Sequence, residues 1–171
     1  MRRFEKFDDD LVAALVRVGW SPSREVDTSS WVQSLELEGY RIHLAAEEVL
    51  ASMGGLVVPP INSSGPNFEN GDPLNFDPVA AGASYREMAL EIEEVLGGSY
   101  FPIGEWLSYS SVFMESGGRV VATGMGWIWE LGETLEEALR LAIFSDRPLV
   151  CLHANPGLSP WPPEVEDGIV V

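Results

Sequence analysis

Short apolar runs separated by glycines fill residues 100–131 and predict an antiparallel β-meander. Two of these runs, residues 111–114 and 119–122, flank the tetrapeptide E-S-G-G, whose glycines can supply the positive φ of a tight hairpin turn. A third run, residues 127–129, follows the hairpin. Before it, Pro102 suits a strand start or a sheet edge. We expect helices to bury one face of this sheet and the other face to be half exposed.

Apolar residues also recur at helical spacing and predict five helices around the sheet. At Ser30, Ser84 and Thr134 a Ser or Thr lies three residues before a Gln or Glu, which is the capping-box pattern. In the last helix Glu136 and Arg140 should pair on the outer face. The predicted helices span residues 8–18, 30–38, 42–53, 84–96 and 134–143.

Between the third helix and the meander the chain should turn sharply. Gly54 and Gly55 end that helix before a short strand at residues 56–58, so at least one of the two should have a positive φ. Residues 61–75 are rich in Asn, Ser, Gly and Pro, which is typical of a functional or mobile loop. Residues 74–77 can return as a strand.

The order of these elements indicates an α+β fold with a single domain. Helices come first, strands cluster after the centre and another helix lies near the end, unlike the alternation of βαβ units. A length of 171 residues is that of one domain. We assign residues 1–146 to the domain. Residues 147–171 should add a strand and a Pro-rich tail that packs on the domain or trails from it.

Composition indicates a folded chain without a membrane span. Hydrophobic residues make up 46% of the chain and include six tryptophans, which excludes disorder. The apolar runs are far shorter than the roughly 20 residues that a bilayer span requires. Aspartates interrupt the start M-R-R-F-E-K-F-D-D-D, so no export signal is expected. The single cysteine, Cys151, fits a reducing compartment, which makes the cytoplasm the expected location.

The net charge is the strongest compositional signal. Ten Lys and Arg against 27 Asp and Glu give 10 − 27 = −17, with an isoelectric point near 4.2. Such a field repels phosphate backbones and anionic lipids, which argues against nucleic-acid and membrane partners. It also accelerates encounter with a basic protein, although selection for solubility alone produces the same charge.

Residues that carry enzymatic or metal chemistry do not converge in the sequence. His43, His153 and Cys151 are too few for a zinc site, so we expect no metal or other cofactor. Adjacent glutamates on a helix project about 100° apart and cannot act together as an acid and base. Trp127 and Trp129 share one strand face, which favours core packing over a stacking platform. These patterns favour a binding protein over an enzyme.

Six short motifs occur in an order seen in a known family. They read G-W-x-P-x-R, L-x-x-x-G-G-L, F-D-P, P-I-G, G-R-V and E-E-A-L. Each is weak alone because glycine-rich corners are common. Together they resemble the third subgroup of SUKH-type immunity proteins over residues 20–143. The residues of these motifs that we single out are Trp20, Arg24, Gly54, Gly55, Asp77, Pro102, Gly104, Gly118 and Arg119.

The resemblance implies a single-domain α+β protein encoded beside a bacterial polymorphic toxin. Such a protein would bind and neutralise the cognate toxin and have no enzymatic activity of its own. Met53 stands here where the family usually has an aromatic residue before Gly-Gly, and the Pro-rich tail lies outside the shared pattern.

Two other classes of function stay open at this point. In one, residues 61–75 form a lid over the pocket of a small-ligand-binding or hydrolytic protein, with Asp72, Asp77 or Arg24 as polar groups. In the other, the chain is a scaffold that assembles with itself. A deep pocket with a strongly shifted carboxylate pKa would support the first, and self-assembly without a partner would support the second.

A row of carboxylates marks the candidate partner surface. Glu87, Glu91 and Glu94 fall at positions i, i+4 and i+7 of the predicted helix 84–96, so they should form one outward ridge. Repulsion along such a row destabilises a helix by a few tenths of a kcal/mol per pair. The ridge suits docking of a basic toxin surface, and the competing interpretation is an ordinary solvated face.

Two further expectations accompany the ridge. Met88, Ile92 and Val95 should form the core stripe on the opposite side of the same helix. Glu69 and Asp72, in the loop at residues 61–75, are additional candidates for contact with the partner.

Overall fold

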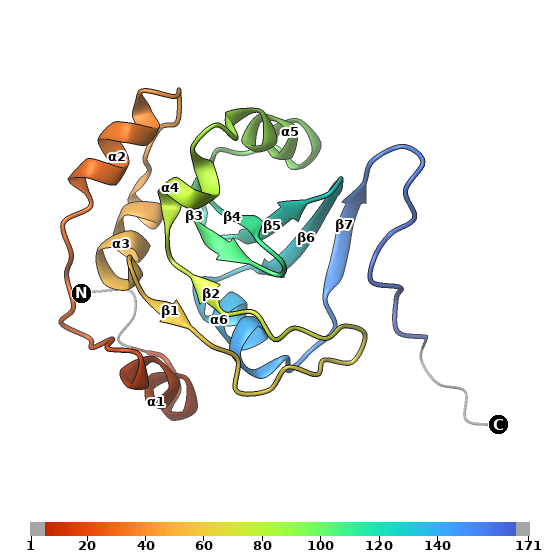
Figure 1. The fold of residues 1–171 in the computed structure, drawn as a ribbon, viewed down its shortest axis with the longest axis horizontal. Coiled ribbons are helices and arrows are strands. Elements are labelled where there is room, and N and C mark those ends of the chain that lie inside the picture. The colour runs from red at the N-terminus through yellow and green to blue at the C-terminus, as the bar shows by residue number, and fades with distance from the viewer. Residues whose placement is uncertain (1–5, 167–171) are drawn as a thin grey trace.

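Seven antiparallel strands form one sheet in the computed structural model, which describes residues 6–166 (Figure 1). Each strand pairs with the next one along the chain, from β1 at one edge to β7 at the other. The predicted α+β single-domain fold is confirmed. The strands are Val57–Val58 (β1), Leu74–Asn75 (β2), Tyr100–Trp106 (β3), Ser110–Glu115 (β4), Val120–Gly124 (β5), Trp127–Gly132 (β6) and Val150–Ala154 (β7).

Six helices surround this sheet within the described residues. Five of them match predicted segments, and the short α4, which begins at a Pro after the N-cap Asp77, was not predicted. Asp77 Oδ1 accepts hydrogen bonds from Val79 N at 3.1 Å and Ala80 N at 3.0 Å, so it caps this helix. The helices are Asp9–Arg17 (α1), Ser29–Glu36 (α2), Leu44–Met53 (α3), Pro78–Gly82 (α4), Arg86–Leu96 (α5) and Leu135–Phe144 (α6).

The predicted meander is confirmed as β3 to β6, and its hairpin turn falls at E-S-G-G. Of the two glycines in that turn only Gly118 has a positive φ, +111°. The expectation that both glycines supply it is therefore wrong. Glu115 explains the difference, because its carboxylate accepts the Gly117 N–H at 2.6 Å and fixes that residue in an ordinary conformation.

Pro102 and Gly104 lie in β3 near the point where the neighbour of this strand changes from β2 to α4. β2 pairs with β3 only at Asn75 and Glu105, so α4 rather than a strand lies beside Pro102, which suits a residue without an N–H. A Cβ atom at Gly104 would lie 2.2 Å from the Asn75 carbonyl oxygen, so the close approach of these two strands requires a glycine there.

Both faces of the central strands are buried, so the expectation of a half-exposed face is wrong. All residues of β3 and β4 are buried except Glu105 and Glu115, which are partly exposed. Helices α3, α4 and α5 contact β3, and α6 contacts β6. Helices therefore cover more of the sheet than the alternation in the strands indicates.

The capping boxes were predicted correctly only at α6. There Thr134 Oγ1 accepts the Glu137 N–H at 3.2 Å. At Ser84 the prediction is wrong, because its backbone has φ +66° and its N–H donates to Glu38 Oε2 at 2.6 Å. At Ser30 it is wrong as well, since α2 begins at Ser29 without a side-chain cap.

Arg140 joins α6 to two other segments instead of pairing with Glu136 as predicted. Its guanidinium bonds to Asp8, the N-cap of α1, and to Asp146 Oδ2 at 3.1 Å. Both of these partners lie outside α6, and the expected pair within the helix does not form.

The residues of the first two motifs, G-W-x-P-x-R and L-x-x-x-G-G-L, meet at the corner between α3 and β1. Gly55 has φ +81°, which confirms the predicted positive φ, whereas Gly54 has φ −51°. Arg24 donates to the carbonyls of Ser52 at 2.7 Å and Gly54 at 2.8 Å, so it caps the end of α3. Trp20 lies beneath this turn, where its indole N–H donates to Ser52 Oγ at 2.9 Å.

Candidate functional site

Helix α5 packs on the sheet through a different stripe from the predicted one. Its fully buried residues are Ala89 and Ile92, while Met88 is half-buried and Val95 remains 43% exposed. The prediction that Met88 and Val95 belong to the core is therefore wrong. The small Ala89 side chain lets α5 approach β3 closely, and this turns the larger Met88 and Val95 to the side.

Glu87, Glu91 and Glu94 are all exposed on α5, and no ion pair or hydrogen bond engages their carboxylates within the part of the chain described. Arg86, the cation nearest to them in sequence, points elsewhere. It lies 3.5 Å from Glu93 Oε1, and its guanidinium carbon lies 5.0 Å from the centre of the Tyr40 ring. The negative charge of the ridge is therefore not neutralised.

A groove of about 410 Å³ runs beside this ridge. Glu91 and Glu94 line it, but Glu87 does not. Met88 and Val95 contribute apolar surface from α5, and the turn between β5 and β6 faces them. The other residues of its wall are Thr123, Gly124, Met125, Gly126, Trp127, Ile128, His153 and Asn155.

Met125 is held outward at the tip of the turn between β5 and β6. It is 73% exposed, and both Met125 and Gly126 have positive φ, +53° and +93°. Two hydrogen bonds fix the turn: Thr123 Oγ1 donates to Trp127 O at 2.9 Å and Asn155 N donates to Gly126 O at 2.8 Å. The groove thus combines an exposed apolar side chain on a fixed turn with the carboxylates on α5.

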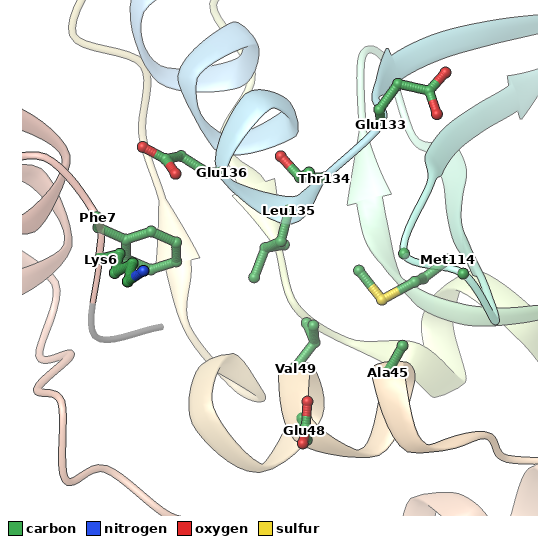
Figure 2. Close-up of a pocket in the computed structure, with 12 residues that line it drawn as sticks. Lys6, Phe7, Ala45, Glu48, Val49, Met114, Glu133, Thr134, Leu135 and Glu136 are labelled. Carbon is green, nitrogen blue, oxygen red and sulfur yellow. The ribbon is translucent and has the colours of Figure 1, made fainter. Parts of the chain in front are cut away.

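A second pocket, of about 260 Å³, lies between α3, the start of α6 and the hairpin of β4 and β5 (Figure 2). Figure 2 shows Ala45, Val49, Met114 and Leu135 converging on its centre. Glu48, Glu133 and Glu136 add carboxylates around it, while Lys6 and Phe7 border it from the N-terminal segment.

Arg119 and its neighbours shape the electrostatics next to this second pocket. Arg119 forms an ion pair with Glu130 and lies 4.0 Å from Glu133 Oε1. A hydrogen bond with Glu130 raises the pKa of Glu133, and the repulsion between the two carboxylates raises it further. Lys6 and Arg119 thus place cations near this pocket, unlike the groove at α5.

Glu69 and Asp72, the two further candidates for contact with the partner, lie in the loop at residues 61–75, far from the ridge on α5. Figure 1 shows the loop and α5 at opposite ends of the molecule. Glu69 is exposed and forms an isolated bridge with Ser64. Asp72 Oδ2 accepts the Ser108 N–H at 2.8 Å, so this side chain fixes the turn between β3 and β4.

Residues 61–75 are tied to the body of the protein by their amide side chains. Asn62 Nδ2 donates to Phe144 O at 3.1 Å, and Asn67 Nδ2 donates to Leu149 O at 3.1 Å. Asn70 is 3% exposed and bonds to Asp72 on both its amide atoms. Neither the groove at α5 nor the pocket of Figure 2 is lined by a residue of this loop, so the loop is not placed as their lid.

The residues that complete the groove carried no signal in the sequence. In the sequence Met125 lies between two glycines, a pattern typical of a turn, and Met88 and Val95 occupy predicted core positions. An exposed methionine at a position with positive φ is unusual, since glycine or asparagine is favoured there.

Among the described residues no three His, Cys, Asp or Glu side chains gather as metal ligands. None of the described helices is long and apolar enough to cross a bilayer.

Comparison with known proteins identifies one family. The family model of the SUKH-3 immunity proteins matches residues 7–143. No curated protein and no solved structure matches the chain significantly. The matched region includes the ridge on α5, the turn that carries Met125 and both strands of that turn, but neither β7 nor the segment that follows it.

Proposed function

The chain belongs to the SUKH-3 immunity protein family, and from that premise we propose that it neutralises a cognate bacterial toxin by binding it. The binding is non-catalytic: the protein blocks the toxin by occupying part of its surface. The toxin surface that it contacts is basic, and the complex forms in the cytoplasm of the cell that makes both proteins. The proposed contact surface is the acidic ridge of α5 together with the adjoining groove.

The observation that carries this proposal is the pairing of exposed apolar side chains with carboxylates for which residues 6–166 supply no partner. Met125 and Val95 are 73% and 43% exposed, and Glu91 and Glu94 stand on the same groove. Interfaces gain affinity from apolar anchors and association rate from complementary charge. A basic toxin segment with an apolar side chain between its cations would satisfy both parts of the groove.

The net charge of the chain supports the same partner chemistry. At −17 the whole molecule attracts a cationic protein over about a Debye length, which is roughly 8–10 Å at physiological ionic strength. The unneutralised ridge then favours one orientation at close range. The pocket of Figure 2 is a weaker candidate because Lys6 borders it and Arg119 lies close by.

Co-expression with the toxin domain encoded beside this gene tests the proposed function. We expect the two proteins to purify as a complex and the chain to restore growth of cells that express the toxin. The variant Glu91→Lys/Glu94→Lys should fail to restore growth. The matched control Glu36→Lys/Glu47→Lys makes the same change in charge at exposed sites on α2 and α3 and should restore it.

Two results would contradict the proposal at different levels. If the wild-type chain neither co-purifies with the toxin nor restores growth, the proposed function is wrong. If both double variants fold and restore growth equally well, the toxin is bound elsewhere and the groove at α5 is not the docking surface.

A further inference from the structure

The segment after β7 turns back and lies against two tryptophans of β6. In Figure 1 it forms the long blue loop that descends beside β7. Leu158 N donates to Asn155 O at 3.0 Å, which closes the first turn. The chain then runs through S-P-W-P-P at residues 159–163 without joining the sheet. We call residues 158–163 the strap.

The strap is held by hydrogen bonds from indole N–H groups to its backbone. Trp127 Nε1 donates to Ser159 O at 2.9 Å, and Trp129 Nε1 donates to Trp161 O at 2.6 Å. The two acceptors are two residues apart, as are the two donors, so strand and strap run in matching register. Asn67 Nδ2 from the loop at residues 61–75 adds a third bond, to Pro163 O at 3.0 Å.

Contacts between aromatic rings also hold the strap against β6. The rings of Trp127 and Trp129 stack with centres 6.1 Å apart and an interplanar angle of 29°. The Trp161 ring meets both of them, at 6.4 Å and 6.0 Å. Aromatic rings, with indole N–H groups that reach backbone carbonyls, are a means by which proteins hold proline-containing peptides, and here the held segment bends at Trp161 and Pro162.

The strap is more exposed than the residues that it covers, except at Pro162, which is buried. Trp129 is 1% exposed, whereas Leu158 and Trp161 keep 41% and 39% exposure. Unlike a strand, the strap has no ladder of backbone hydrogen bonds. The two tryptophans lie within the region that matches the family, and the strap lies beyond it. The strap therefore covers an aromatic surface that lies within the matched region.

We infer that the face formed by Trp127 and Trp129 is a binding site for a proline-containing peptide that bends as the strap does, and that the strap occupies this site within the same chain. The strap can leave without breaking the sheet, and a proline-containing segment of a second protein can then take its place. This inference does not depend on the proposed toxin. Trp127 also lines the groove at α5, so the open site would extend that groove along β6.

Hydrogen exchange in the unmodified chain tests whether the strap opens. After correction for intrinsic rates, the indole protons of Trp127 and Trp129 should exchange at least about tenfold faster than the backbone amides in the middle of β6, because strap opening needs no unfolding of the sheet. Both indole protons should share one rate. Indole protection equal to that of the β6 amides would overturn the inference, since the strap would then be released only by global unfolding.

Binding of a labelled peptide tests the specificity of the site. The probe is a fluorescein-labelled peptide with the sequence of residues 155–166, and the protein is the full chain carrying Trp161→Ala, which weakens the strap. This variant should bind the probe at least about tenfold more tightly than the wild-type chain, in which the strap competes at an effective concentration on the order of millimolar.

A matched peptide without the prolines of the strap is the control for the specificity of the site. Replacement of Pro160, Pro162 and Pro163 by alanine in the probe should weaken binding about tenfold or more, because the proline rings no longer restrict the backbone to the bent conformation of the strap. Equal binding of the two peptides, or no binding by a folded Trp161→Ala chain at about millimolar probe, would overturn the inference. If that variant does not fold, hydrogen exchange in the wild-type chain still decides.

Discussion

Gly54 shows how a single residue fixes the corner between α3 and β1. A Cβ atom there would lie 2.4 Å from Trp31 Cζ3 and 2.5 Å from Leu50 O. We predict that Gly54→Ala lowers the free energy of unfolding by about 1–3 kcal/mol, as overpacking usually does. The matched control is Gly71→Ala, since a Cβ at Gly71 would meet nothing within 4 Å. Urea denaturation measures both variants, and equal stability of the two would show that the corner tolerates a side chain.

The turn between β3 and β4 holds three successive residues in the left-handed region. Leu107, Ser108 and Tyr109 have φ of +50°, +57° and +64°, and Tyr109 is 88% exposed. Because asparagine tolerates this conformation better than tyrosine, Tyr109→Asn should raise the free energy of unfolding by about 0.5–1 kcal/mol. Tyr109→Ala keeps the Cβ atom and so the strain. A gain in Tyr109→Ala as large as that in Tyr109→Asn would refute the explanation by strain.

Glu105 makes the stability of the protein depend on pH. Its burial in β3 raises the pKa of its carboxyl group, and the charge of Asp77 raises it further. The folded state therefore holds the proton more tightly than the unfolded state, so the contribution of Glu105 is favourable below the unfolded pKa, near 4.5, and is lost as the pH rises through the folded pKa. We predict that Glu105→Gln is more stable than the wild type at about pH 7 and that its advantage shrinks towards about pH 4. Thermal unfolding at both pH values measures this, and an advantage independent of pH would exclude ionisation as its cause.

At the scale of elements, α5 separates residues that hold the fold from residues that line the groove. Ile92 is fully buried, whereas Val95 is 43% exposed beside Met88. We predict that Ile92→Ala lowers the free energy of unfolding by about 2–5 kcal/mol and that Val95→Ala lowers it by less than about 0.5 kcal/mol. Chemical denaturation compares the two variants. Similar large losses would restore Val95 to the core and remove it from the groove.

The same elements show what can be predicted from the sequence. The meander of β3 to β6 and the cap of α6 follow from local patterns, because glycine turns and a Thr before a Glu act within a few residues. The cap at Ser84 and the Met88 and Val95 positions of the core stripe of α5 were predicted wrongly, whereas Ile92 is buried as predicted. They are decided by tertiary contacts, such as the bond of Ser84 N to Glu38 and the approach of Ala89 to β3, which no local pattern contains.

The groove could be predicted only in part for a similar reason. The ridge glutamates share one helix, so their spacing alone indicates that they point the same way. The opposite wall comes from residues 123–128 and from β7, which are separated from α5 in the sequence. Sequence spacing carries no information about which hairpin the sheet brings next to a given helix. Met125 therefore became visible only in the fold.

At the scale of the whole molecule, charge is abundant but unevenly neutralised. Arg86 pairs with Glu93 of its own helix, and Arg119 and Arg140 pair with carboxylates of other segments, whereas the ridge on α5 has no such partner among residues 6–166. We propose that the long-range negative field brings a basic protein close and that the ridge then guides the toxin to the groove.

The association rate constant with the cognate toxin tests this claim most directly. The triple variant Glu87→Lys/Glu91→Lys/Glu94→Lys should keep the wild-type circular dichroism spectrum but associate at least severalfold more slowly, with a weaker dependence on salt. The control Glu36→Lys/Glu47→Lys/Glu164→Lys makes the same change in net charge away from the groove and should lose much less. Equal rate constants and equal salt dependence in the two folded variants would contradict the claim, because net charge alone would then account for the attraction.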